Sequence, residues 1–570
     1  MLTRLALRNF KLFGDVEIEL GDRVVFVGPN NSGKSSALQA LALWSTGIRR
    51  WVEKRGSGDV PAERAGVTIN RRDLVALPVP SANLLWRDLH VRQGFREEGK
   101  TKTKNILVDI EVDGIDGGKS WHTAIEFDYA NEESFYCRSK LTKDGSRLEV
   151  PEAAAKVRLA FLPPMSGLAA NETRLDEGAI AVRIGEGRTA EVLRNLCWQV
   201  FQGPEKGTWR RIVERMRELF GVTIGDPEYI AERGEIRMGF RQGNTELDLS
   251  SSGRGQQQTL LLLAHMAANP GAVLLLDEPD AHLEVLRQRQ IYEALTRTSM
   301  ETGSQIIVAS HSEVILDEAA DRDIVVAFLG KPHRIDDRGS QLKKGLKWIG
   351  YDQYLQAEQT GWVLYLEGAT DLAILRAFAE KLGHEARQYL QRPFVHYVAN
   401  QPAKARDHFH GLREAKPDLV GIAIYDRLES PPTEDPSLAQ LTWKRRELEN
   451  YLTTPEVLRG FAADFGRRQV GELFAASIVT HMDEAIEKVV EAARVLEGDD
   501  PFGSDAKASP FLDSVFRNFF KRLGLPEATM RKTDFHTLAP FLAREAIAPE
   551  IVEKLNSIVE VAKRAIPIGA

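Results

Sequence analysis

The chain has 570 residues, of which 43% are hydrophobic and 28% are charged, and its formal net charge is −7. This length exceeds what one ordinary hydrophobic core serves, so we expect two or three globular domains. The acidic balance provides no general argument for nucleic-acid binding, although a local basic groove is compatible with it.

The two cysteines, Cys137 and Cys197, have no nearby partner and no metal-type spacing. This usage argues against a disulfide framework or a cysteine zinc site and indicates a reducing compartment. The N-terminus lacks the apolar core of a signal peptide. The longest apolar run, around 260–263, is far shorter than the roughly 20 residues of a spanning helix. We therefore expect a cytoplasmic protein with no membrane partner.

Three strands are predicted at the start of the chain, over 2–10, 15–20 and 23–28. The third is short, apolar and β-branched, and it leads directly into a glycine-containing loop. Residues 36–44 then follow a helical period. Strand, loop and helix in this order form the context that a phosphate-binding loop requires.

The next 300 residues alternate between strand and helix patterns. Short strands and polar turns are predicted over 51–150, with a basic patch at Lys100–Lys104, and helices over about 180–225. This helical insertion is too short for a long coiled-coil arm and has no sustained heptads, so we interpret it as a dimerisation or docking element. Apolar core strands follow at 272–276 and 305–309.

A polar, glycine-containing stretch over 330–361 has the composition of a domain connection. We place the boundary between two domains at 345/346. Beyond it a second α/β pattern begins, with a strand, a helix and two further strands, and residues 455–563 are mainly helical in pattern. The predicted fold class is α/β, with 1–345 and 346–570 as its two domains.

The sequence Gly28–Ser35 matches the phosphate-loop pattern G-x-x-x-x-G-K-S. Gly28 and Gly33 let backbone amides wrap phosphates at the positive end of the following helix. Lys34 would reach the β- and γ-phosphates, and Ser35 would hold Mg²⁺. The predicted ATP-contacting residues of the whole domain are Gly28, Asn31, Ser32, Gly33, Lys34, Ser35, Ser36, Asp277, Ser252 and Gly253.

Four further elements follow in a fixed order. An apolar strand ends in Asp277-Glu278, where Asp277 would support Mg²⁺ through water and Glu278 would polarise the attacking water. His311 ends the next apolar strand. The segment 249–258 precedes the first of these strands, and 281–284 follows it. Each element alone has a structural explanation, but the five together resemble ABC ATPases, with 249–258 as the signature that serves the opposite subunit and His311 as the γ-phosphate sensor.

Two features depart from that family. The signature segment contains S-S-G-R-G-Q in place of S-G-G-Q, so either Ser251 or Ser252 is left as the phosphate-facing serine. No glutamine stands in a clear Q-loop context, and Gln93 is a weak candidate. We expect turnover that is slow or conditional on a partner.

A second group of acidic residues lies in the C-terminal domain. Glu367 follows one apolar strand, Asp371 enters the next helix, and Asp426 follows another apolar strand. Adjacent parallel strands would bring these carboxylates to one sheet edge. Such a group attracts Mg²⁺ or Mn²⁺, because the cation relieves the mutual repulsion.

This arrangement resembles a Toprim domain, and the whole chain resembles the OLD (overcoming lysogenization defect) family of ATP-dependent nucleases. The segment 441–452 is also similar to Toprim effectors of PARIS-type anti-phage systems. The resemblance implies Glu367 as metal ligand or general base, and Asp371 and Asp426 as further ligands. It also suggests Lys532 as the transition-state lysine. Glu449, predicted on a helix with Glu447 behind it, is a plausible additional ligand.

The family pattern D-x-D would place an aspartate at position 428, where this chain has Leu428; Glu429 is a substitute only if the strand has ended. Structural explanations also exist. Glu367 and Asp371 could cap a helix, and Arg445, Arg446 and Glu449 could form a surface ion-pair ladder.

The leading functional interpretation is an ATP-controlled, metal-dependent nuclease of anti-phage defence that cuts DNA or RNA, tRNA included. The alternative is an ATP-driven sensor or scaffold with a catalytically weak Toprim domain that recruits or releases a separate effector. The expected partners are nucleic acid, a second copy of the chain and a phage-derived trigger or effector protein. The expected cofactors are ATP with Mg²⁺, and Mg²⁺ or Mn²⁺ at the second site.

Overall fold

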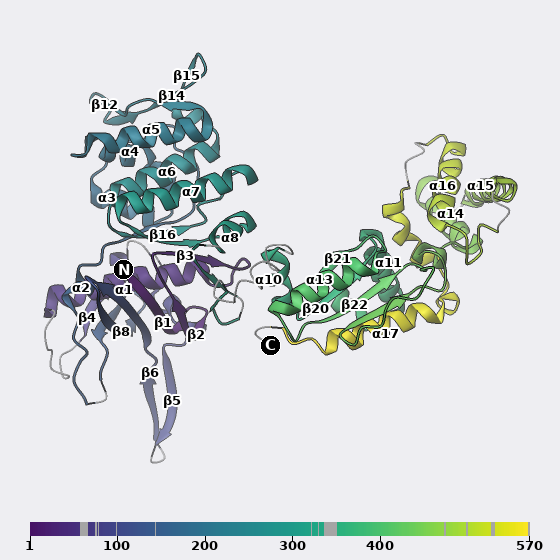
Figure 1. Ribbon diagram of the computed structural model, residues 1–570, viewed down its shortest axis with the longest axis horizontal. Coiled ribbons are helices and arrows are strands. Elements are labelled where there is room, and N and C mark those ends of the chain that lie inside the picture. Colours follow the sequence, from purple (N-terminus) through teal and green to yellow (C-terminus); the bar gives the residue numbers. More distant parts are fainter. Residues whose placement is uncertain are drawn as a thin grey trace. The chain divides into compact units, whose positions relative to one another are not determined.

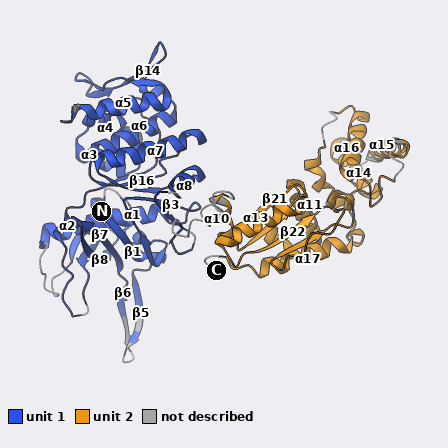
Figure 2. Ribbon diagram, viewed as in Figure 1, with its two compact units in different colours: residues 1–343 blue, residues 344–570 orange. Residues whose placement is uncertain are grey.

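A computed structural model describes most of the chain, in two compact units, 1–343 and 344–570 (Figure 2). The predicted boundary at 345/346 lies outside the described residues. No helix among these residues is long and apolar enough to cross a lipid bilayer. The described residues are 1–56, 66–74, 77, 79–97, 100–142, 144–320, 322–328, 330–335, 350–471, 475–496, 500–525 and 530–567.

The first sheet of unit 1 is antiparallel and contains the first two of the three strands predicted at the N-terminus. Its inward positions are alternating apolar residues, as in β7, where Val108, Ile110 and Val112 are fully buried. The strand order is β2 (Phe13–Glu19), β1 (Leu2–Phe10), β7 (Val108–Asp116), β8 (Lys119–Asn131), β9 (Ser134–Ser139) and β4 (Val67–Asn70).

The second sheet of unit 1 is parallel except at one edge. Its central strands are short apolar runs buried on both faces, as parallel strands covered by helices are. Helix α1 (Lys34–Arg55) contacts strands of both sheets, and one hydrophobic core joins them. The strand order is β10 (Leu159–Leu162), β16 (Val273–Asp277), β17 (Gln305–Ala309), β3 (Arg23–Val27), β18 (Ile324–Ala327) and the antiparallel β19 (His333–Arg334).

On one side of β16, unit 1 consists mainly of helices (Figure 1). The segment predicted as a helical insertion contains α3 (Glu177–Gly185), α4 (Leu193–Gln202) and α5 (Lys206–Phe220). Helices α4 and α5 pack on α6 (Arg254–Ala268), which in turn packs on α7 (Val285–Thr302). Helix α8 (Glu313–Ala320) follows β17. The short strands here are β11 (Val222–Ile224), β14 (Gly239–Gln242) and β15 (Thr245–Asp248) in one sheet, and β12 (Glu228–Ile230) with β13 (Glu235–Arg237) in another.

A separate hairpin, β5 (Arg92–Glu97) and β6 (Lys100–Asn105), extends from unit 1 as a ribbon (Figure 1). It contains the predicted basic patch, of which Lys104 is exposed, whereas the side chains of Lys100 and Lys102 lie outside the described residues. Gln93, the weak Q-loop candidate, is exposed on β5 and pairs with Lys104 across this hairpin. Gln93 therefore lies in a different sheet from β3, the strand that precedes the phosphate loop.

Unit 2 contains a four-stranded parallel sheet, in the order β21 (Val395–Tyr397), β20 (Trp362–Leu366), β22 (Val420–Tyr425) and β23 (Leu438–Thr442). One hydrophobic core joins this sheet to the C-terminal helices. The remaining elements are α10 (Tyr351–Thr360), α11 (Ala369–Leu382), α12 (Ala386–Leu390), α13 (Pro402–Ala415), η6 (Leu448–Tyr451), α14 (Pro455–Val470), α15 (Ala475–Leu496), α16 (Ala508–Arg522), η8 (Lys532–Phe541) and α17 (Pro549–Lys563).

Candidate functional sites

The phosphate loop connects the end of β3 to the start of α1, as predicted. Gly28 and Gly33 have φ values of 149° and 103°, and a Cβ atom at Gly33 would lie 2.7 Å from the Phe13 ring. A Cβ atom at Gly28 would lie 2.8 Å from the Phe328 carbonyl oxygen. Side chains at both positions would therefore collide with their surroundings, so the loop depends on glycine.

Two side chains of this loop have unusual polar surroundings. The buried Lys34 ammonium donates to the carbonyl oxygens of Gly28 and Pro29, at 2.8 and 2.9 Å. Burial lowers the pKa of Lys34, although the carboxylates of Glu278 and Asp277 oppose that shift. The Ser32 hydroxyl is buried and has no hydrogen-bond partner among the described residues. An anion in the loop would provide a partner for both groups.

The residues predicted to hold Mg²⁺ at this site are in contact. The Ser35 hydroxyl donates to Asp277 Oδ1 at 3.0 Å, which joins the first turn of α1 to the end of β16. Burial and the neighbouring Glu278 raise the pKa of Asp277 to about 6, against the opposing effects of Ser35 and Lys34. A hydroxyl and a carboxylate beside a loop for phosphates are the ligand types that Mg²⁺ accepts, so these residues fit the ion.

Glu278 and His311 lie next to each other at the ends of β16 and β17. The Glu278 amide donates to the Ala309 carbonyl at 2.8 Å, and Glu278 has a φ of 48°, which is rare for a non-glycine residue. His311 Nδ1 is 3.5 Å from Glu278 Oε1, and both side chains are partly open to solvent. The two predicted catalytic groups are therefore adjacent.

Sequence reasoning missed a buried contact beneath this pair. Asp280 accepts a hydrogen bond from the Ser310 hydroxyl at 2.8 Å, and burial raises the pKa of Asp280. This bond ties the segment after Asp277-Glu278 to the residue before His311. The only signal in the sequence was that Asp280 and Ser310 each flank a residue already singled out.

The signature segment corrects one residue assignment. Ser252, which we had assigned to the nucleotide, is buried, and its hydroxyl donates inward to the Leu249 carbonyl at 2.7 Å. Ser251 is exposed, as is Gly253 at the start of α6. Of the two candidate serines, Ser251 is therefore the one with an accessible side chain.

The two carboxylates predicted at the sheet edge of unit 2 are in contact. Glu367 follows β20 and Asp426 follows β22, and these strands pair in parallel with Tyr365 opposite Ala423. Asp426 also accepts a hydrogen bond from the Leu448 amide at 3.2 Å. Burial raises the pKa of Asp426 to about 9, aided by its hydrogen bond to Glu367 and by the charges around it. The raised pKa favours the protonated form of Asp426, whose side chain interacts with that of Glu367.

Asp371 and Glu449 complete this acidic cluster, which we define as Glu367, Asp371, Asp426 and Glu449. Asp371 Oδ2 accepts hydrogen bonds from the amides of Glu367 and Gly368, at 3.0 and 3.3 Å. Burial raises the pKa of Asp371 to about 7, with Glu449 adding to the effect. Asp371 thus has the capping role considered as the structural explanation, and it also feels the charge of the cluster.

Lys532 lies beside the cluster although it is distant in sequence. Its ammonium is 3.2 Å from Glu449 Oε1, and the Glu449 side chain is 2% exposed. Partial burial works against the charged form, but the carboxylates of Glu449, Glu447 and Glu367 outweigh it and raise the pKa of Lys532. Glu449 itself lies on the 3-10 helix η6 and not on the α-helix that we predicted.

The proposed ion-pair ladder is absent among the described residues. The Arg445 guanidinium donates to the Asn450 carbonyl and that of Arg446 to the Asp505 carbonyl, whereas Glu449 pairs with Lys532. Glu447 accepts a hydrogen bond from the Ser509 amide at 2.9 Å and so caps α16.

Position 428 lies beyond the strand, because β22 ends at Tyr425. Leu428 is half-buried there and Glu429 is exposed. Among the described residues, no three acidic, histidine or cysteine side chains are close enough together to hold a metal ion as they stand. An ion bound between Glu367 and Asp426 would complete its coordination with water or with a further side chain that turned toward it.

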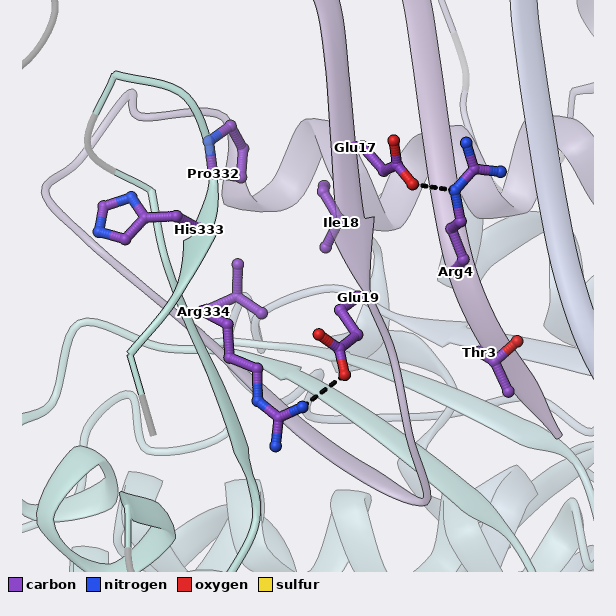
Figure 3. A pocket seen from close by; sticks show the side chains of 9 residues that line it. Thr3, Arg4, Glu17, Ile18, Glu19, Pro332, His333 and Arg334 are labelled. Carbon is purple, nitrogen blue, oxygen red and sulfur yellow. Dashed lines mark hydrogen bonds and ion pairs between the residues drawn. The ribbon is translucent and has the colours of Figure 1, made fainter. Parts of the chain in front are cut away.

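A cavity of about 350 Å³ lies elsewhere, between β1, β2 and β19 (Figure 3). Ion pairs join Arg4 to Glu17 and Arg334 to Glu19 across it. None of the described residues that line it was predicted to have a function, so it contributes to neither candidate site.

Two family models match unit 1. One, described as "AAA domain, putative AbiEii toxin, Type IV TA system", matches residues 170–317. The other, described as "AAA ATPase domain", matches residues 1–77. These ranges contain the phosphate loop, the signature segment, Asp277, Glu278 and His311. Unit 1 is therefore similar to AAA ATPase domains over both ranges.

Two curated proteins match shorter segments. An uncharacterized protein of Methanocaldococcus jannaschii is 32% identical over 113 residues, 20% of this chain and 31% of that protein. A ribose import ATP-binding protein of Rubrobacter xylanophilus is 30% identical over 115 residues, 20% of this chain and 22% of that protein. The chain thus covers less than a third of either relative's length.

Two solved structures cover a larger part of the chain at lower identity. The SMC head domain from Thermotoga maritima is 16% identical, with a TM-score of 0.31, and the match covers 59% of this chain and 98% of that one. An Smc head domain with an extended coiled coil, bound to the C-terminal domain of ScpA derived from Pyrococcus furiosus, is 15% identical. Its TM-score is 0.35, and the match covers 61% of this chain and 98% of that one.

Proposed function

We propose that the protein is a nuclease, dependent on Mg²⁺ or Mn²⁺, whose activity is controlled by ATP, and that it acts in anti-phage defence. The observation that carries this proposal is the contact between Glu367 and Asp426 at the carboxyl edge of a parallel sheet, with Lys532 beside them. The family model that matches residues 170–317 is described as a putative toxin of a toxin–antitoxin system, and this description agrees with a defensive role.

The nuclease site would combine a cation with a fixed positive charge. A divalent ion would be held by Glu367 and Asp426, with Asp371 or Glu449 turning toward it. The bound ion would supply an activated water and neutralise charge on a phosphodiester. The high pKa of Asp426 supports this proposal, because crowded carboxyls are the groups that a cation stabilises. Lys532 would then stabilise the transition-state phosphate.

The ATPase site would be completed by a second copy of the chain. Lys34, Ser35 and Asp277 would hold Mg-ATP, and Glu278 with His311 would orient the attacking water. The exposed Ser251 of the other copy would contact the γ-phosphate. This arrangement makes the protein at least a dimer when ATP is bound, with closure of the two heads setting the nuclease activity.

A scaffold function is the second candidate. Leu428 in place of a carboxylate and the lack of a three-ligand metal group among the described residues favour it. In that case the Toprim-like domain would bind and release a separate effector, under the control of ATP.

Incubation of the purified protein with plasmid DNA and with tRNA, in Mg²⁺ and in Mn²⁺, separates the two functions. We expect cleavage of at least one substrate, abolished in Glu367→Ala and retained in Glu414→Ala, which removes an exposed carboxylate on α13. Absence of cleavage under every metal and nucleotide condition would favour the scaffold.

A further inference from the structure

A buried arginine lies between the helical layer of unit 1 and the signature segment. Arg194, in the first turn of α4, has a side chain that is 1% exposed. Its Nη1 donates to the Ala169 carbonyl at 2.9 Å, and its Nη2 donates to Asp248 Oδ1 at 3.2 Å. A buried guanidinium is costly unless its donors are satisfied, so these partners fix its position.

Glu172 pairs with the Arg194 guanidinium, whose Nη1 lies 3.9 Å from Glu172 Oε2, and also holds the backbone around Arg194. The buried Glu172 accepts hydrogen bonds from the amides of Arg194 and Asn195, at 2.9 and 2.7 Å. The Asn195 side chain also donates to Glu172 Oε1 at 2.8 Å. These bonds satisfy amides at the start of α4 that have no partner within the helix. The arginine is therefore presented from a rigid helix end.

Asp248 transmits this position to the signature segment. The oxygen that accepts from Arg194 also accepts from the amide and the hydroxyl of Ser250, at 2.8 and 2.6 Å. Asp248 thereby caps the 3-10 helix η5 (Leu249–Ser251) and remains half exposed. Asp248 Oδ1 thus joins Arg194 on α4 to Ser250 in the signature segment.

The other side of the loop is anchored by α6. The Gln257 side chain donates to the Ser252 carbonyl at 2.9 Å, and the Ser252 hydroxyl donates to the Leu249 carbonyl. Ser251 lies between the two anchors and is exposed. Its position thus depends on Asp248 on one side and on Gln257 on the other.

We propose that Arg194, acting through Asp248, is a positioning residue that holds the signature loop in the conformation required to contact nucleotide on a second copy of the chain. This inference rests on the composite ATP site of the proposed function. The proposal makes the position of the signature loop depend on α4, because Arg194 on this helix holds Asp248, and Asp248 caps the loop.

Asp248→Ala in the full-length protein is the direct test, because it cuts the link at its exposed end and leaves the buried arginine in place. Glu246→Ala is the matched control: it removes an exposed carboxylate from the same strand whose partner, Arg241, is also exposed. Arg194→Lys keeps the charge but loses the two-branched geometry of the guanidinium.

Two measurements are made on each variant. Hydrogen exchange of residues 249–253 reports the loop itself, whereas steady-state hydrolysis and binding of a fluorescent ATP analogue report the two halves of the ATP site. In Asp248→Ala we expect exchange at Ser250 to be about tenfold faster and kcat about tenfold lower, since a hydrogen bond to a charged group is lost. Analogue affinity should stay within twofold, and Glu246→Ala should match the wild type.

Unchanged exchange in Asp248→Ala would overturn the inference whatever the hydrolysis rate. Faster exchange with unchanged kcat would also overturn it, because the loop would then be mobile without consequence. If the wild type itself hydrolyses no ATP, both the proposed composite site and this inference are contradicted. Faster exchange in Asp248→Ala would then show only that Asp248 caps the loop.

Discussion

The side chains of Glu367 and Asp426 interact at the carboxyl edge of the parallel sheet in unit 2, where burial and Glu367 raise the pKa of Asp426. Two interacting carboxylates cannot both be ionised without strong repulsion. Their contact requires a proton, or a cation that replaces it. The interaction therefore makes the free energy of unfolding of unit 2 depend on pH.

Stability without metal should fall with rising pH. The pKa of Asp426 is raised to about 9 and that of Asp371 to about 7, so the folded protein retains protons that the unfolded chain has lost. Their stabilising contribution is present at low pH and is lost as pH rises through 7 to 9. Urea unfolding in EDTA at pH 6 and pH 9 should show this loss in wild type and a smaller one in Asp426→Asn. An equal loss in Asp426→Asn would contradict the assigned shift. Glu414→Gln, which neutralises an exposed carboxylate on α13, serves as control.

Lys532→Ala should lower the rate of phosphodiester cleavage by about a hundredfold, as expected when a fixed charge on the transition state is removed. Metal affinity should change little, because Lys532 is not a ligand. Cleavage rates against Mn²⁺ concentration separate the two effects. Arg531→Ala, which alters the exposed neighbour, should cleave like wild type. A loss confined to the metal dependence would mean that Lys532 acts only by orienting Glu449.

Glu278→Gln should bind ATP and retain it, because the amide cannot polarise the attacking water. Hydrolysis should fall at least a hundredfold, and light scattering should show a dimer that persists in ATP. His311→Ala should also slow hydrolysis, since the two side chains are adjacent. Wild-type hydrolysis in Glu278→Gln would show that another residue activates the water.

Variants damaged in opposite halves of the ATP site should complement each other. Lys34→Ala disables the phosphate loop, and Ser251→Arg blocks the signature. A dimer of one with the other contains one site with both halves intact. Mixing the two inactive proteins should therefore restore part of the hydrolysis, whereas mixing Lys34→Ala with wild-type-like Lys54→Ala adds nothing beyond the activity of the latter. No recovery in the first mixture would contradict a site completed between copies.

Local sequence patterns predicted the strand ends that position both sites. Short apolar strands end near Lys34 and Asp277 in unit 1 and near Glu367 and Asp426 in unit 2. These strand ends identified one sheet edge in each unit, because parallel strands end on the same side. The adjacency of Glu367 and Asp426 followed from that geometry alone.

Other features depended on packing that no local pattern encodes. Ser252 turns inward because the Leu249 carbonyl accepts its hydrogen bond, so Ser251 is the exposed one of the two candidate serines. Glu449 reaches the cluster from a 3-10 turn, and the Arg194–Asp248 contact joins residues far apart in sequence. Such contacts are set by tertiary structure and carry no periodic signal.

Control of the nuclease by ATP is tested most directly by the rate of nucleic-acid cleavage at fixed Mn²⁺ with ATP, with ADP and without nucleotide. We expect the wild-type rate to differ at least tenfold between ATP and no nucleotide, and the rate of Lys34→Ala to be the same in all three conditions. Equal wild-type rates with and without ATP would contradict the account, because the composite site and the acidic cluster would then act independently.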